Sequence, residues 1–322
     1  GDDREVLHGM CDHVVAPDRP NHANTGSRLE ANLDLFRSLA AAIDDANVVW
    51  NGLQRLEVVS VTLDQDRDEP QLVFESMNST GLDLETSDLV RNYMLMGCSM
   101  AEQKTLYEDY WLPMERVLGN LSFDVFLHDW MVVTLKKPVL KGHVMYAEFK
   151  RFAADSSLPR MERTRNLTGE HAGIRQIYAA IKGVAAAGSC DMNVDRRLES
   201  IQKLGSTVTD PLVMYMFAAW KRDRVSCDGL LRMLADLESY LFRRMICSVS
   251  SNGLNKLVPS LIVRLDSAED DLAETFAALL ITETAKASRM PTDSEFRQAF
   301  ARREPVPAGL AMQVSACRLG EL

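Results

Sequence analysis

An unbroken apolar run at residues 212–220 (LVMYMFAAW) constrains the fold of this chain more than any other feature of its sequence. A helix on the surface of a globular protein carries one polar face, and this run has none. Asp210-Pro211 precedes the run, and a short polar residue followed by proline is a typical start of a helix. We therefore expect a buried central helix here.

Apolar residues at helical spacing recur through the rest of the chain after residue 98. They predict a helix around Phe149, another around Tyr110 that is interrupted near Pro113, and helices at 123–135, 230–246, 272–286 and 293–302. No repeat of fixed period accompanies them, which argues against a solenoid. The expected fold class is mainly α, with an irregular multi-helix domain at residues 99–322.

The first part of the chain is less regular. Residues 1–26 are polar and contain prolines and a glycine, so we expect a poorly structured lead-in. Ser27 and Glu30 have the spacing of a capping box, and apolar residues at helical spacing follow them to about residue 46. Residues 56–63 (LEVVSVTL) are rich in β-branched residues and form the only strand that the sequence predicts.

Residues 73–97 (VFESMNSTGLDLETSDLVRNYMLMG), which we call the elbow, predict two helices joined by a polar turn. Gly81 suits the left-handed conformation that ends a helix, and the short polar side chains at 86–88 suit the start of the next one. Backbone amides exposed at a helix start can bind an anion. A well-capped turn without any ligand explains the same residues equally well.

The elbow resembles the signature of the GmrSD-type restriction endonuclease N-terminal domain family (domain of unknown function 262) in order and spacing: Phe74-Glu75-x-x-Asn78-x-x-Gly81-x-x-Leu84-x-x-x-Asp88-Leu89-x-x-Asn92. Residues 237–244 (LESYLFRR) are similar to a downstream helix of that family. Pro291-x-Asp293-x-Glu295-Phe296 is similar to one of its late elements. The resemblance therefore extends over nearly the whole chain.

This resemblance implies a fold and a chemistry. In the family the elbow follows a strand and closes a ParB/sulfiredoxin-like α/β domain, so residues 27–98 are expected to be the remnant of such a domain. That domain hydrolyses a nucleoside triphosphate with Mg and gates a nuclease that attacks modified foreign DNA. By the resemblance, the residues expected to contact nucleotide are Glu75, Asn78, Ser79, Thr80 and Asp88.

The chain also departs from the family. The Asp-Gly-Gln-Gln-Arg run of the family is absent, and residues 51–55 (NGLQR) resemble a degraded copy that lies too close to the strand. No counterpart of an HNH-type nuclease domain is visible, so we assign no catalytic residue. The chain is expected to be a fragment or degenerate member of a modification-dependent (type IV-like) restriction or phage-defence protein. The alternative is a non-catalytic helical protein-interaction module.

Charge and partners can be weighed from composition. A formal net charge of −10 argues against binding of DNA over the whole surface, although a local basic patch is compatible with it. Lys136, Lys137 and Arg244 are candidate nucleic-acid contacts, and exposed helix faces or internal salt bridges explain them equally. Arg243 is expected to pair with Asp236 or Glu238. A nuclease subunit or a second copy of the chain remains an open partner.

Cysteines, possible metal ligands and hydropathy bound the cellular setting. The six cysteines show no paired spacing, which suits reduced thiols in a cytoplasmic protein. No apolar run approaches the roughly 20 residues that a membrane span needs. His8-x-x-Cys11-x-His13 has metal-ligand types but no second cluster to complete a site, so no metal is expected.

Overall fold

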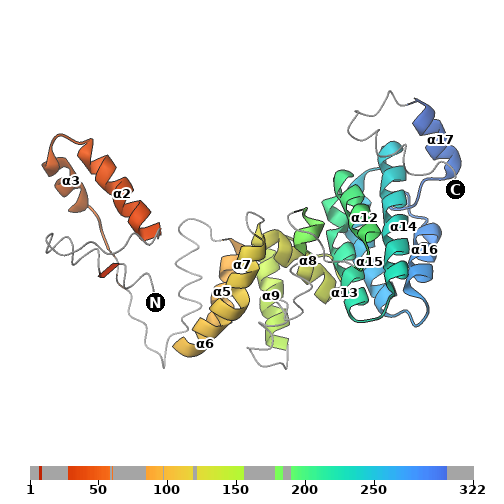
Figure 1. The fold of residues 1–322 in the computed structure, drawn as a ribbon, viewed down its shortest axis with the longest axis horizontal. Coiled ribbons are helices and arrows are strands. Elements are labelled where there is room, and N and C mark those ends of the chain that lie inside the picture. Colours follow the sequence, from red (N-terminus) through yellow and green to blue (C-terminus); the bar gives the residue numbers. More distant parts are fainter. Residues whose placement is uncertain are drawn as a thin grey trace. The chain divides into compact units, whose positions relative to one another are not determined.

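The computed structural model describes residues 7–8, 28–58, 60, 85–96, 98–118, 122–155, 178–183 and 190–302. The chain divides into two compact units, residues 1–68 and residues 69–322. Every regular element in the described ranges is a helix, and none of these residues forms a strand (Figure 1). The expected mainly α fold class is confirmed.

In the described residues 28–58 of the first unit, two helices stand where the sequence predicted one. They are α2 (Arg28–Ala41) and α3 (Ala46–Leu53). Asp45 directly precedes α3 and caps it, because its carboxylate accepts a hydrogen bond from the Asn47 backbone amide at 2.9 Å. None of the side chains described at residues 29–58 is buried, and Phe36 and Trp50 are 69% and 59% exposed.

The strand predicted at residues 56–63 is wrong for the residues that the structure describes. Residues 56–58 and residue 60 have no regular structure, and Leu56 and Val58 are 69% and 89% exposed. β-branched residues favour a strand only where a neighbouring strand and a buried face are present, and no strand is described near them. Residues 59 and 61–63 lie outside the described residues.

Between residues 85 and 155 the described part of the second unit has six helical segments: α5 (Thr86–Leu95), α6 (Met100–Thr105), η1 (Leu106–Trp111), α7 (Leu112–Leu118), α8 (Phe123–Leu135) and α9 (His143–Asp155). Helices α6, η1 and α7 follow one another without a gap. The interruption expected near Pro113 is therefore wrong. The segment η1 is a π-helix whose wider turn ends with Leu112 N–H donating to the Tyr107 carbonyl. Proline lacks an N–H and crowds the preceding turn, and the π segment accommodates it.

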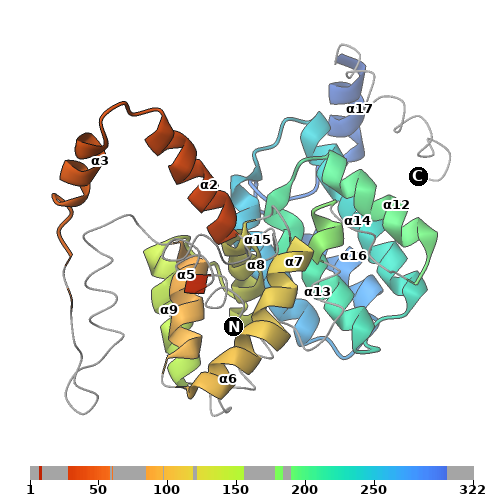
Figure 2. The ribbon, with the colours of Figure 1, turned by 60° about the vertical axis from the view of Figure 1, so that its left-hand side comes forward.

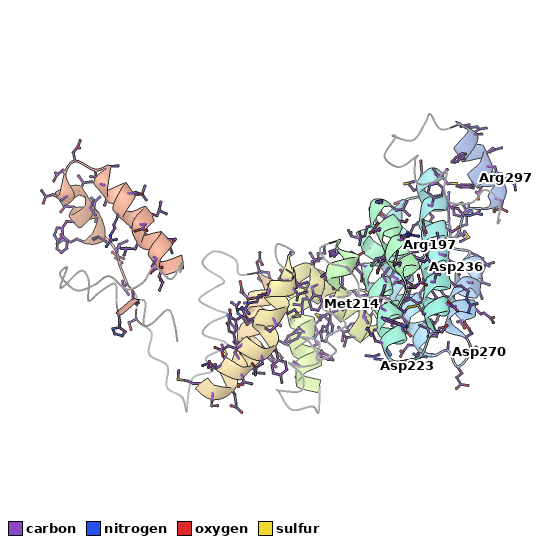
Figure 3. All side chains as sticks on the ribbon, in the orientation of Figure 1. Arg197, Met214, Asp223, Asp236, Asp270 and Arg297 are labelled. Atoms are coloured by element: carbon purple, nitrogen blue, oxygen red, sulfur yellow. A yellow bond between two sulfur atoms is a disulfide. The ribbon has the colours of Figure 1, made fainter. Side chains whose placement is uncertain are left out.

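Eight further elements lie in the described residues 190–302: α12 (Met192–Lys203), η2 (Thr207–Thr209), α13 (Asp210–Lys221), α14 (Cys227–Ile246), η3 (Ser251–Gly253), α15 (Leu254–Asp266), α16 (Leu272–Thr282) and α17 (Asp293–Arg302). Residues 210–219 of α13 are all buried, including Met214, which is labelled in Figure 3. Helix α13 packs against α8, α14 and α15 (Figure 2). The expected buried central helix is confirmed. The sequence did not predict α12 or α15.

A continuous apolar core joins these helices. It runs from Leu89 on α5 through Phe126 on α8 and Phe217 on α13 to Leu280 on α16. Helix α5 packs against α8 and α9, which lie beyond the domain boundary expected at residue 98. Within the described ranges, none of the helices combines the length and the apolar composition that crossing a membrane would require.

Cys190, two residues before α12, forms a disulfide with Cys227, the first residue of α14, and their Cα atoms are 6.0 Å apart. The expectation of reduced cysteines is wrong for this pair. The two cysteines are 37 residues apart in sequence, and they meet because α12 packs along α14. A disulfide is uncommon in reducing compartments, so the cytoplasmic location loses the support that it drew from the cysteines.

We expect the disulfide to stabilise the fold through the unfolded chain. Closing a loop of 37 residues removes unfolded-state entropy worth about 3–4 kcal/mol. The free energy of unfolding in urea should therefore fall by about that amount in the Cys190→Ser/Cys227→Ser variant. Adding dithiothreitol should lower the free energy of unfolding of the wild type to the value of the variant. It should leave the free energy of unfolding of the variant unchanged. An effect of dithiothreitol on the variant would mean that other cysteines are responsible.

Candidate functional site

Most of the predicted nucleotide contacts cannot be located in the fold. Glu75, Asn78, Ser79 and Thr80 lie outside the described residues. Asp88 is described and lies in the first turn of α5, the helix that the sequence predicted for the second half of the elbow. The helix begins at Thr86 and ends at Leu95, close to the predicted bounds.

The start of α5 already holds a carboxylate. Asp124, the second residue of α8, accepts hydrogen bonds from the Thr86 amide at 3.0 Å and from the Ser87 amide at 2.6 Å. Thr86 and Ser87 are both buried. Glu85, the residue before the helix, makes no side-chain cap. Asp124 therefore occupies the two amides that would otherwise attract an anion, and this helix start does not fit a nucleotide phosphate.

Asp88 is directed toward other protein side chains. Its carboxylate accepts a hydrogen bond from Arg91 at 2.6 Å, and Arg91 also contacts Glu115 on α7 at 3.3 Å. Glu115 in turn accepts from the Trp111 indole N–H at 2.9 Å. The side chains of Asp88 and Arg91 are about a third exposed, so this pair contributes little stability on its own. The chain of contacts links α5 to η1 and α7.

We expect Asp124 to stabilise the fold through the start of α5. Replacing a capping carboxylate typically costs about 1–2 kcal/mol, so Asp124→Ala should lower the free energy of unfolding in urea by about that much. Asp228 is a matched control, because it is also the second residue of its helix, α14, and is exposed. Asp228→Ala removes a similar charge without uncapping another helix. Equal losses in the two variants would contradict the capping role.

Four ionisable side chains and a tyrosine form a buried ionic network between α8, residues 178–182 and α13. Asp129 on α8 accepts a hydrogen bond from the Tyr178 hydroxyl at 3.0 Å, and its carboxylate lies 3.9 Å from the Lys182 ammonium. Lys182 also forms an ion pair with Asp210, the first residue of α13. His128 contacts Asp129 through Nδ1 at 3.0 Å. Asp129, Tyr178 and Asp210 are all buried.

Burial dominates the electrostatics of this network. It raises the pKa of Asp210 to about 6, although the Lys182 charge acts in the opposite direction. Burial, together with the neighbouring Asp129 charge, also raises the pKa of the Tyr178 hydroxyl. Tyr178 therefore stays neutral and donates its proton to Asp129 instead of acting as a base. The network holds three elements together, and the arrangement shows no activated nucleophile.

Asp210 does not have the role that its sequence context suggested. It was expected to cap the start of α13 ahead of Pro211, whereas Thr209 precedes the helix and Asp210 is its first residue. The carboxylate contacts Lys182, which belongs to a segment that the sequence did not predict as a helix. No signal in the sequence pairs these two residues, because only packing of the helices brings them together.

The two late motif elements pack against each other. Arg243 donates a hydrogen bond to Asp293 at 2.6 Å, and its guanidinium carbon lies 5.2 Å from the centre of the Phe296 ring. Phe242 and Phe296 meet edge to face, with ring centres 5.8 Å apart. The expected partners of Arg243 are therefore wrong: its carboxylate partner is on α17, and Glu238 pairs with Arg197 on α12, which is labelled in Figure 3.

Arg244, the next residue on α14, is buried. It is 3% exposed and donates to the backbone carbonyls of Ser250, Ala287 and Arg289 at 2.6, 2.8 and 3.1 Å. Its guanidinium also lies 5.2 Å from the centre of the Tyr240 ring. This position does not suit the nucleic-acid contact that the sequence suggested for Arg244. The N–H donors of its planar guanidinium instead hold together the loops that follow α14 and α16.

The two lysines proposed for nucleic acid also have acidic partners. Lys136 pairs with Asp266 at the end of α15, and Lys137 pairs with Glu148 on α9 at 2.6 Å. Each lysine lowers the pKa of its carboxylate partner by donating a hydrogen bond to it. These acids neutralise the basic grouping, which weakens the case for a phosphate-binding strip here.

Metal ligands do not gather in the described part of the chain. No group of three His, Cys, Asp or Glu side chains there has an arrangement that would hold a metal ion. Cys11 and His13 of the amino-terminal His/Cys cluster lie outside the described residues. Comparison of the chain with protein-family models, with curated proteins and with solved structures finds no match.

Proposed function

We propose that this chain is a non-catalytic helical protein-interaction module and that α2 and α3 bind its partner. The observation that carries the proposal is the exposure of large apolar side chains on both helices. Phe36 and Leu39 on α2 are 69% and 55% exposed, and Trp50 and Leu53 on α3 are 59% and 54% exposed. Helices with an apolar face that buries nothing are marginal in water and gain stability by packing on another surface.

Charge favours a different protein over a second copy as the partner. Residues 28–58 contain five acidic residues (Glu30, Asp34, Asp44, Asp45, Glu57) and three arginines (Arg28, Arg37, Arg55), which gives 3 − 5 = −2. The whole chain carries −10, and like net charge opposes the association of two copies. The surface that fits is an apolar groove with a basic rim on another protein.

The charged groups of the second unit support the non-catalytic part of the proposal. Asp124 fills the start of α5, and Arg243 and Arg244 are used in contacts with α17 and with nearby carbonyls. The network at Asp129 and Asp210 is paired internally. Such pairing gives each of these groups a role in holding the fold together, which is what a non-catalytic module needs of them.

Photo-crosslinking tests which surface covers α2 and α3. Trp50 is replaced by p-benzoylphenylalanine in the full chain, which is irradiated in its own cells, and the cross-linked peptides are identified by mass spectrometry. We expect one other protein to be captured, with a yield that falls at least about tenfold when Phe36→Asp is added. The same photo-reactive residue in place of Leu140, which is 68% exposed in the second unit, is the matched control.

Two results would contradict the proposal. Cross-links to a second copy of the chain would make α2 and α3 a self-association surface. Cross-links to residues 69–322 of the same molecule would make them part of the fold. In either case the partner would not be another protein.

A second candidate function is a part of a modification-dependent restriction protein. The observation that favours it is the contact of Arg243 with Asp293 and Phe296, because a motif that recurs in a family is expected where it preserves a fold. Its test is a calorimetric titration of nucleoside triphosphate and Mg against the wild type and the Glu75→Ala/Asn78→Ala variant. Binding that the variant loses would support this candidate, and equal, negligible binding would remove the nucleotide site from it.

A further inference from the structure

His128 faces two hydrogen-bond acceptors at once. Its Nδ1 lies 3.0 Å from the Asp129 carboxylate and its Nε2 lies 3.0 Å from the Val139 carbonyl oxygen. A neutral imidazole has one N–H and one lone pair, so it can satisfy only one of these acceptors. An imidazolium ion has two N–H groups and satisfies both. The geometry therefore fits the protonated side chain.

The charged groups around His128 are compatible with a protonated imidazole that exchanges its proton with water. Asp129 cannot provide it while ionised, and its other oxygen accepts from Tyr178 and lies 3.9 Å from Lys182. Lys182 is paired with Asp210 on α13. With His128 protonated, two positive charges balance two carboxylates in the network. The His128 side chain is 19% exposed, so its proton can exchange with water.

Val139 lies in the loop that joins α8 to α9, residues 136–142. Lys136 and Lys137 at the start of this loop are anchored through Asp266 and Glu148. In the middle of the loop, the Val139 side chain is buried in the core and the Val139 carbonyl accepts from His128. The next residue, Leu140, is 68% exposed. The bond from His128 therefore fixes the middle of the loop to α8.

We propose that His128 is a pH-sensitive latch that holds the loop at residues 136–142 on α8 while protonated and releases it when deprotonated. After loss of one proton, the remaining N–H stays with the charged Asp129 carboxylate, because charge-assisted hydrogen bonds are the stronger ones. The lone pair on Nε2 then faces the Val139 carbonyl, and that contact becomes repulsive. The loop is held while both ring nitrogens carry a proton and opens once Nε2 has lost its proton.

The latch is tested by following the imidazole and the loop in the same full-length protein. Histidine ring nitrogens labelled with ¹⁵N report the protonation state of His128 by NMR from about pH 5 to about pH 9. Hydrogen exchange of amides in 136–142, divided by intrinsic rates, reports opening of the loop. We expect opening to increase about tenfold over the same pH range in which His128 loses its proton, as loss of one hydrogen bond implies.

Three variants separate the latch from other causes. His128→Gln should make opening of the loop independent of pH, because an amide does not titrate in this range. His143→Gln changes an exposed histidine at the start of α9 and should keep the wild-type response. Asp210→Asn removes the carboxylate paired with Lys182 and should also keep that response, because Asp210 reaches His128 only through Lys182 and Asp129.

Several results would overturn the proposal. Loop protection that stays constant while the wild-type His128 signals titrate would show that the imidazole does not hold the loop. A pH response that survives His128→Gln, or one that Asp210→Asn abolishes, would place the switch elsewhere. If His128→Gln does not fold, the comparison of ring titration with loop opening in the wild type decides the question alone.

Discussion

Burial of α13 on every side is the constraint on which the rest of the second unit depends. A helix without a polar face must be enclosed, and α8, α14 and α15 enclose it. Enclosure also buries Asp210 at the start of α13, where burial raises the pKa of the carboxyl to about 6 and Lys182 supplies a partner. The buried ionic network is thus a consequence of placing the first turn of this helix inside the protein, because a buried charge without a partner is costly.

The same logic explains why residues that look functional in the sequence have structural roles. A helix start that is buried needs an acceptor, and Asp124 provides it for α5. Carbonyls at the ends of loops need donors, and Arg244 provides three hydrogen bonds to them. Polar and charged residues at fixed spacing are the signature of a binding site and equally of buried backbone groups that must be paired.

The sequence predicted features whose pattern lies within one helix, and it did not predict contacts between residues far apart in the chain. The apolar run at 212–220 identified α13, and Asp293 to Arg302 gave α17 with its bounds, because periodicity is contained within one element. Helix α12 places Val194, Leu198 and Ile201 at i, i+4 and i+7 and buries all three, so the same local signal was present there and the prediction missed it. The Cys190–Cys227 disulfide and the Arg243–Asp293 pair join elements far apart in sequence, and no local spacing encodes them.

The strand error and the unburied helices share one physical cause. The β-branched residues in the sequence 56–63 and the apolar stripe of α2 both indicate a surface to be covered, and neither says what covers it. A strand needs a second strand, and an amphipathic helix needs any apolar face. None of the described side chains of α2 and α3 is buried, so the stabilising surface for this unit is not supplied by the two helices themselves. An apolar pattern therefore predicts the need for a contact, and the identity of the contact must come from outside the segment.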